Sequence, residues 1–291
     1  MKHKNKFNIN YWLRKFYTSA IYQKLNPNKD KIKKQVFTSI YKSNHWVQKD
    51  DTLSKDSISV SGHGSNIDTD QFFDLKKIFT KIINDKQINS VLDMPCGDFL
   101  WFYEIIKDKN IDYIGVDIVD ELIEANKLKY QNKNFSFIND DIINFHTNKK
   151  FDLILIRDLF IHIQNSDIKK IIQNLNKMNF SYVALNSYNN KINHDVVVGN
   201  HRKVNLLIEP FNLEKPLEFF KDHEDGKFIF LYEKKNFIQN LVAGSGIEPL
   251  TSGLWVLRSN QLSYPAIIYN RLIIEIFIVS IYFLNEVSIK E

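Results

Sequence analysis

Cysteine is almost absent from the sequence, because Cys96 is the single thiol among 291 residues. One thiol forms neither an internal disulfide nor a zinc site built mainly from cysteines, so a reducing compartment is expected. Proline and glycine are also scarce, with six and nine residues, which excludes collagen-like and low-complexity chains. No apolar run of secretory type follows the first lysines. We therefore expect a cytoplasmic protein without a metal site.

The remaining composition is that of a globular protein. Hydrophobic residues make up 44% and charged residues 25% of the chain, which is the ordinary range for a folded domain. At about 150 residues per domain, the length indicates one large domain, or one domain with appendages.

Positive charge is concentrated at the start of the chain. Up to Lys34 there are ten Lys or Arg residues against the single acid Asp30, so this leader (residues 1–60) begins with +9 and the remainder carries −4. Interleaved aromatic residues would allow contact with an anionic membrane or with nucleic acid. The alternative, which we favour, is the codon bias of an A+T-rich gene, and no nucleic-acid partner is expected. The pattern predicts a helix from Tyr11 to Leu25, a break at Pro27 and then a polar stretch.

The middle of the chain, residues 61–238, alternates short apolar runs with amphipathic segments. This alternation predicts an α/β fold with a doubly wound, Rossmann-like sheet. The expected strands are Ser90–Met94, Tyr113–Val116, Phe135–Ile138, Phe151–Ile156, Tyr182–Leu185 and Phe228–Tyr232. The expected helices are Phe72–Ile83, Leu100–Lys107, Glu121–Lys129 and Asp167–Met178, where apolar residues recur at helical spacing.

The composition changes abruptly near Val242. Three of the nine glycines fall within the ten residues 244–253. Residues 243–266, AGSGIEPLTSGLWVLRSNQLSYPA, resemble a peptide read from the strand opposite a transfer RNA gene. We therefore interpret residues 241–291 as a read-through tail. Its apolar segment 266–284 is about long enough to cross a bilayer, and the alternative is an inner-membrane anchor, although Arg271 and Glu275 would make insertion costly.

Acidic residues follow three of the expected strands. Asp93 ends the first strand and precedes a turn with Gly97, Asp117 ends the second, and Asp140 and Asp141 follow the third. The carboxyl edge of such a sheet is where open α/β folds bind ligands, and a carboxylate after the second strand suits the hydroxyls of an adenosine ribose. An acid after the third strand is placed to receive an adenine amino group.

With these residues, the central segment resembles class I S-adenosylmethionine-dependent methyltransferases. The resemblance rests on Ser61-Gly62-His63-Gly64-Ser65, on Pro95-Cys96-Gly97-Asp98 with Trp101, and on Arg157-Asp158 after the fourth strand. It implies a seven-stranded sheet that binds S-adenosylmethionine. The implied cofactor residues are Asp93, Pro95, Cys96 and Gly97 in the loop, Asp117 and Ile118 at the ribose, and Asp141 or Asp140 at the adenine.

The loop departs from the usual pattern of three alternate glycines. Pro95 and Phe99 take the outer positions, and only Gly97 remains. A pyrophosphate needs closer backbone approach than this, which counts against a dinucleotide cofactor. A sulfonium nucleoside has no phosphate and tolerates the change.

Candidate catalytic residues follow the fourth strand. Asp158 and His162 are four residues apart and would share one side of a helical turn. Either could be the base that removes a proton from the methyl acceptor. The alternative is that Arg157 and Asp158 form a structural ion pair while His162 packs. Arg202 would suit an anionic or sugar-like substrate, or it is an ordinary surface arginine.

The sequence thus predicts a methyltransferase with S-adenosylmethionine as cofactor. The acceptor is expected to be a small molecule or glycan. The resemblance suggests a hydroxyl of a sugar or small metabolite. The alternative is an inactive, membrane-associated protein that uses the basic leader and the apolar tail. Residues 61–65 would form a flexible flap over the cofactor.

Overall fold

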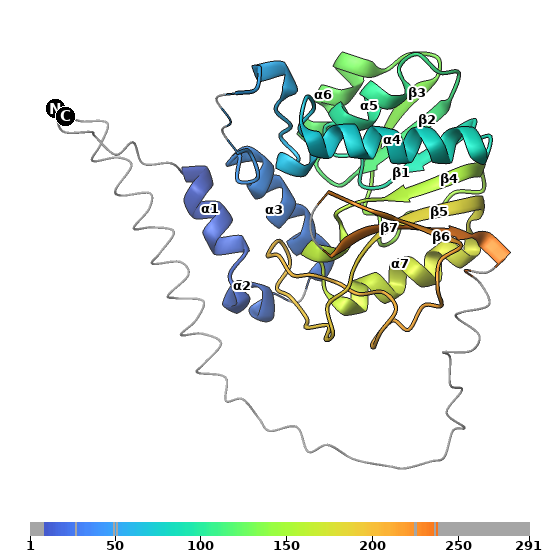
Figure 1. Ribbon diagram of the computed structural model, residues 1–291. Coiled ribbons are helices and arrows are strands. Elements are labelled where there is room, and N and C mark those ends of the chain that lie inside the picture. The colour runs from blue at the N-terminus through green and yellow to red at the C-terminus, as the bar shows by residue number, and fades with distance from the viewer. Residues whose placement is uncertain are drawn as a thin grey trace, which may run out of the picture. The chain divides into compact units, whose positions relative to one another are not determined.

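The computed structural model describes residues 9–237 except 27, 49, 51, 224, 225 and 236. Within them a seven-stranded sheet has the order β3-β2-β1-β4-β5-β7-β6 (Figure 1). Neighbours from β3 to β5 are parallel, while β7 is antiparallel to both β5 and β6. The strands are β1 Ser90–Asp93, β2 Asp112–Asp117, β3 Phe135–Asn139, β4 Lys150–Ile156, β5 Asn179–Tyr188, β6 Glu218–Lys221 and β7 Lys227–Glu233.

The predicted seven-stranded, doubly wound sheet is confirmed. The strand β6 was not among the expected runs, because its four residues alternate between half-buried and exposed at the edge of the sheet. Phe219 at its centre is 66% exposed. Such a short edge strand has no continuous apolar run for the sequence to reveal.

Helices cover both faces of the sheet and follow the predicted ranges closely. They are α4 Asp70–Asp85, α5 Leu100–Ile106, α6 Asp120–Tyr130 and α7 Asn165–Lys177. The helices α4, α5 and α6 share one core cluster with Val91 and Leu153, whereas α7 shares the other with Leu92 and Ile154. Neighbouring strand residues point to opposite faces, so these paired positions show that each buried strand feeds two cores.

The strand order reverses between β1 and β4. From β1 the chain proceeds outward to β2 and β3, and it then returns to place β4 on the other side of β1. In open α/β sheets, ligands bind beyond the carboxyl ends of the strands at such a reversal. The topology therefore singles out the loops after β1, β2 and β4.

The leader differs from the prediction. It forms three helices: α1 Ile9–Tyr17, α2 Ala20–Leu25 and α3 Lys29–Lys42. The single helix expected over 11–25 is wrong because the Ser19 hydroxyl caps a new helix by accepting from the Tyr22 amide at 3.2 Å. The stretch after Pro27 is helical because Ile32, Val36 and Ile40 recur every four residues and are buried.

In the part of the chain described here, no helix combines the length and apolar character needed to cross a membrane. The read-through tail 241–291 and its apolar segment 266–284 lie outside the described residues.

Candidate functional site

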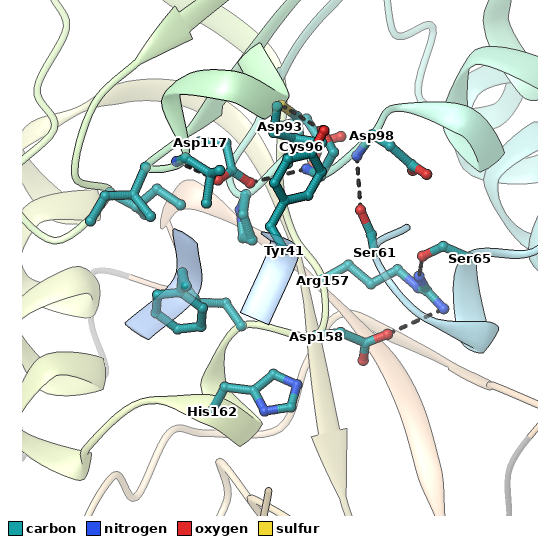
Figure 2. Close-up of a pocket in the computed structure, with 18 of the residues that line it drawn as sticks. Tyr41, Ser61, Ser65, Asp93, Cys96, Asp98, Asp117, Arg157, Asp158 and His162 are labelled. Carbon is teal, nitrogen blue, oxygen red and sulfur yellow. Dashed lines mark hydrogen bonds and ion pairs between the residues drawn. The ribbon is translucent and has the colours of Figure 1, made fainter. Parts of the chain in front are cut away.

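A cavity opens at the carboxyl ends of β1, β2 and β4, where the strand order reverses. It encloses about 1090 Å³ of space, including a part that is open to solvent. Figure 2 shows residues from distant parts of the sequence converging on it. The predicted site residues that line it are Asp93, Pro95, Cys96, Gly97, Asp117, Ile118, Asp141, Arg157, Asp158 and His162.

The loop after β1 is held in a tight conformation by its neighbours. The Gly97 amide donates to the Asp117 carboxylate at 3.2 Å, and the Asn126 side-chain amide donates to the Gly97 carbonyl at 2.7 Å. Gly97 has a φ of +53°, and a Cβ there would collide with the Ser61 hydroxyl. Position 97 therefore requires glycine for both its backbone conformation and its close neighbour.

Phe99 explains why this loop dispenses with its third glycine. Its ring is fully buried and stacks on Tyr113 with the ring centres 4.1 Å apart. The residue also has a left-handed φ of +60° just before α5. The aromatic stack thus fixes the loop on the side of the buried core, and Gly97 is the loop's one glycine, at the place where the backbone lines the cavity.

Asp117 lies at the end of β2, where its carboxylate faces the cavity. One oxygen accepts from the Val119 amide at 3.0 Å and the other from the Gly97 amide at 3.2 Å. Burial raises the pKa of Asp117 to about 6, against the opposing effect of these amide bonds. Each carboxylate oxygen has a further lone pair, so the group can still accept bonds from hydroxyls of a ligand.

Asp93 is more strongly perturbed. It is 2% exposed, and its only hydrogen bond with another side chain in the described structure is from the Tyr113 hydroxyl at 2.9 Å. Burial raises the pKa of Asp93 to about 8, although the Tyr113 hydrogen bond and the Arg157 charge work in the opposite direction. At neutral pH this side chain is therefore mostly protonated, and a cation bound in the cavity would lower its pKa and favour the carboxylate.

Arg157 connects the loop after β4 to residues 61–65. Its guanidinium donates to the Gly64 carbonyl at 2.7 Å and to the Ser65 hydroxyl at 3.2 Å, and it lies 4.8 Å from the centre of the Trp101 ring. Figure 2 shows it between Ser65 and Asp158, whose carboxylate is 3.3 Å away. Its Nε atom is buried without a hydrogen-bond partner. Arg157 therefore lines the cavity as a cation that is bound to residues 64 and 65 on one side and to Asp158 on the other.

Asp158 is held as a carboxylate by two cations. Lys227 Nζ lies 3.0 Å from it, and Lys227 also pairs with the buried Asp222 at 3.2 Å. Burial works to raise the pKa of Asp158, but the charges of Arg157 and Lys227 outweigh it and hold the pKa well below its usual range. A carboxylate with so little affinity for a proton is a poor general base.

His162 has the opposite character. Burial lowers its pKa to about 4, so the ring is neutral at physiological pH. Its Nδ1 atom lies 3.0 Å from the Asn200 carbonyl oxygen, which can only accept. The proton therefore belongs on Nδ1, and Nε2 carries a free lone pair. The ring stacks on Trp46 with centres 4.7 Å apart.

Two predicted residues do not line the cavity. Arg202 donates to the carbonyls of Phe160, Ile163 and His194 and to the side chain of Asn165, so its guanidinium clamps the chain on either side of His162. Asp140 lines a neighbouring surface groove beside α1 and α3. The guanidinium of Arg202 is therefore used to hold the backbone near His162, and it does not line the cavity.

The leader supplies a cavity wall that sequence reasoning missed. Lys33, Phe37 and Tyr41 on α3, together with Trp46, line the cavity. The Lys33 ammonium is nearly buried and lies 3.3 Å from the Asp141 carboxylate, which ties α3 to the end of β3. A signal was present, because these three positions are four residues apart and so share one face of a helix.

Asp98 was also missed as a site residue, and it pairs the loop with residues 60 and 61. Its carboxylate accepts from the Val60 amide at 2.8 Å, and its own amide donates to the Ser61 hydroxyl at 2.8 Å. Together with Arg157, this exchange attaches both ends of the segment 61–65 that was expected to form a flap. In the described ranges, no cluster of three or more His, Cys, Asp or Glu residues could hold a metal ion.

Comparison with known proteins gives a family match for the segment that forms most of the site. Residues 91–178 match a family described as a methyltransferase domain. Among solved structures, the N-methyltransferase NodS from Bradyrhizobium japonicum WM9, in complex with S-adenosyl-L-homocysteine, is 12% identical with a TM-score of 0.49 over 67% of this chain and 97% of its own. Magnesium protoporphyrin IX methyltransferase from Synechocystis PCC 6803 is 12% identical with a TM-score of 0.48, over 70% and 99%. No curated protein sequence matches the chain.

Proposed function

We propose that the protein is an S-adenosylmethionine-dependent methyltransferase that acts on a hydroxyl of a sugar or another small metabolite. The observation that carries this proposal is that the matched segment and the cavity share the same acidic residues. The segment matching a methyltransferase domain, residues 91–178, supplies Asp93, Asp117, Asp141 and Asp158 to one cavity at the reversal of strand order.

The edge of the cavity near β2 and β3 suits an adenosine. Asp117 has lone pairs for the two ribose hydroxyls, and Asp141 lies on the same side of the cavity. Ile118, Leu122 and Ile142 provide apolar surface for a purine ring. A dinucleotide fits less well, because Pro95 and Phe99 stand where a pyrophosphate would need glycine.

The opposite end of the cavity suits an amino acid. The cationic guanidinium of Arg157 and the Ser65 hydroxyl beside it both line the cavity and suit a carboxylate. Asp93, which is neutral until a cation approaches, provides the partner for an ammonium. Bound here, S-adenosylmethionine would supply a methyl group activated by its sulfonium. The protein itself then has to orient the acceptor and take up its proton.

His162 is the residue we assign as the base. Burial keeps the ring neutral and lowers its pKa to about 4, so His162 is a weaker base than a free imidazole but binds a proton more tightly than Asp158 does. Its Nδ1 is fixed by the Asn200 carbonyl, and its Nε2 is free to accept a proton. A neutral hydroxyl acceptor requires such a base, whereas Asp158 is held as a weakly basic carboxylate by its two cationic neighbours. Trp46, whose ring stacks on His162, gives this end an aromatic wall for the acceptor's ring or chain.

The test uses methyl-tritiated S-adenosylmethionine with a fractionated extract of small metabolites and glycans. We expect the wild-type protein to transfer label to an acceptor, and His162→Asn to lower the rate about 100-fold or more while it leaves binding of S-adenosylhomocysteine unchanged. His146→Asn, on a histidine that does not line the cavity, is the matched control. Transfer by His162→Asn at the wild-type rate would refute the assignment of the base, and binding without any transfer would refute the reaction.

A further inference from the structure

The first two helices expose an unusual amount of apolar surface. Twelve large apolar side chains are exposed in the described part of the chain, and six of them fall within residues 9–25. They are Ile9, Tyr11, Trp12, Leu13, Ile21 and Leu25. No residue of α1 is buried. We call this set, together with Lys15 and Lys24, the leader surface.

One side of α1 is already used for packing, which defines the side that is free to meet a partner. The Asn10 side chain donates to the Lys42 carbonyl at 3.2 Å, and the Arg14 guanidinium lies 3.4 Å from the His45 ring. At 100° per residue, Trp12 lies on the opposite side of the helix, and Lys15 lies on the flank next to it. Figure 1 shows α1 and α2 outside α3, on the side away from the sheet.

Charge indicates what kind of partner would fit this surface. The first 34 residues carry ten basic residues and one acid, whereas the rest of the chain is net negative. In the described leader, Lys15, Lys24, Lys29 and Lys31 are all exposed. Lys15 also lies 4.8 Å from the Tyr11 ring centre and 5.6 Å from that of Trp12. Cationic groups therefore border the aromatic ones directly.

We propose that the leader surface binds an anionic lipid bilayer, with α1 and α2 lying in the plane of the interface. Trp and Tyr favour the boundary between headgroups and acyl chains, and lysines beside them attract anionic headgroups. The bilayer is favoured over a protein partner because the apolar residues and the excess of positive charge occupy the same short helices. It is favoured over nucleic acid because Ile9, Ile21 and Leu25 have no role in binding phosphates.

This binding would bring the enzyme's cavity close to the membrane. The helix α3, which contacts α1, contributes Lys33, Phe37 and Tyr41 to the cavity wall. Membrane attachment is independent of the proposed methyl transfer, since none of the residues in the leader surface lines the cavity.

The experiment is co-sedimentation of the full chain with vesicles of phosphatidylcholine, either alone or mixed with phosphatidylglycerol. We expect binding to the mixed vesicles only, weakening as ionic strength rises. Trp12→Ala should lower the partition coefficient about tenfold, and Lys24→Gln about fivefold, which corresponds to one lysine near an anionic surface. Leu128→Ala is the matched control, because Leu128 is 91% exposed but lies on α6.

Several results would overturn the proposal. Equal binding to neutral and mixed vesicles would remove the role of charge, and unchanged binding by Trp12→Ala and Lys24→Gln would place any membrane contact elsewhere in the chain, for example in residues 266–284. Absence of binding at low ionic strength would refute it outright. A dimer in light scattering that Trp12→Ala dissociates would instead assign the leader surface to a second copy of the chain. S-adenosylhomocysteine titrated into the same variants reports separately on the proposed enzyme.

Discussion

Replacement of Asp93 by asparagine should make the protein more stable at neutral pH. Asp93 is almost fully buried in the cavity wall, and its pKa is raised to about 8. The folded protein therefore favours the protonated side chain, whereas the unfolded chain releases the proton near its ordinary pKa of 3.8. Stability contributed by this group is complete below pH 3.8 and is lost as the pH rises towards 8.

The magnitude follows from the interval between these pKa values. Each pH unit above 3.8 costs about 1.36 kcal/mol, so the acid lowers the free energy of unfolding by about 4 kcal/mol at pH 7. Asparagine keeps an oxygen for the Tyr113 hydroxyl but brings an NH2 group that needs a partner, at a cost of about 1–2 kcal/mol. We expect a net gain of about 2 kcal/mol at pH 7.

The assay is urea unfolding followed by circular dichroism at pH 5, 7 and 8.5. The advantage of Asp93→Asn should grow from pH 5 to pH 8.5, and Asp108→Asn, on an exposed acid, should show no such trend. The variant should also bind S-adenosylhomocysteine less tightly, since the proposed partner for the ammonium is lost. A loss of stability that is the same at all three pH values would show that Asp93 is ionised in the folded protein and would refute this reasoning.

Two further predictions concern the two ends of the proposed cofactor site. Asp117→Asn should weaken binding of S-adenosylhomocysteine about 10- to 100-fold in calorimetry at pH 7.5. It should also remove the decline in wild-type affinity that is expected below about pH 6, where Asp117 becomes protonated. A similar loss in Asp120→Asn, on an acid outside the cavity, would contradict a specific role for Asp117. Arg157→Gln should weaken S-adenosylhomocysteine about 10- to 100-fold yet leave 5′-methylthioadenosine, which has no carboxylate, within about twofold; equal losses for the two ligands would mean that Arg157 only maintains the fold.

The sheet could be predicted from sequence because its strands are short apolar runs bounded by clear helices. Buried parallel strands have this pattern on both faces, so β1, β2 and β4 were found almost residue by residue. The acids at their ends were found for the same reason, since position after a strand places a side chain at the sheet edge. Asp93 and Asp117 meet in one cavity as that argument requires.

Contacts between distant segments could not be predicted in the same way. From sequence we expected Arg202 either to bind an anionic or sugar-like substrate or to be a surface arginine, but its guanidinium donates to four carbonyl or amide oxygens of the chain. It also separated the leader from the site, because Lys33 reveals its role only when α3 lies against Asp141. The choice between Asp158 and His162 depended on Lys227, whose charge reaches Asp158 from β7.

The most direct test of the central claim is calorimetric titration of S-adenosylhomocysteine into the full chain at pH 7.5. The account predicts one site per chain with a dissociation constant in the micromolar range, about −8 kcal/mol, and competition by S-adenosylmethionine but not by a nicotinamide dinucleotide. A well-folded protein that binds neither S-adenosyl compound, or that binds the dinucleotide instead, would contradict it.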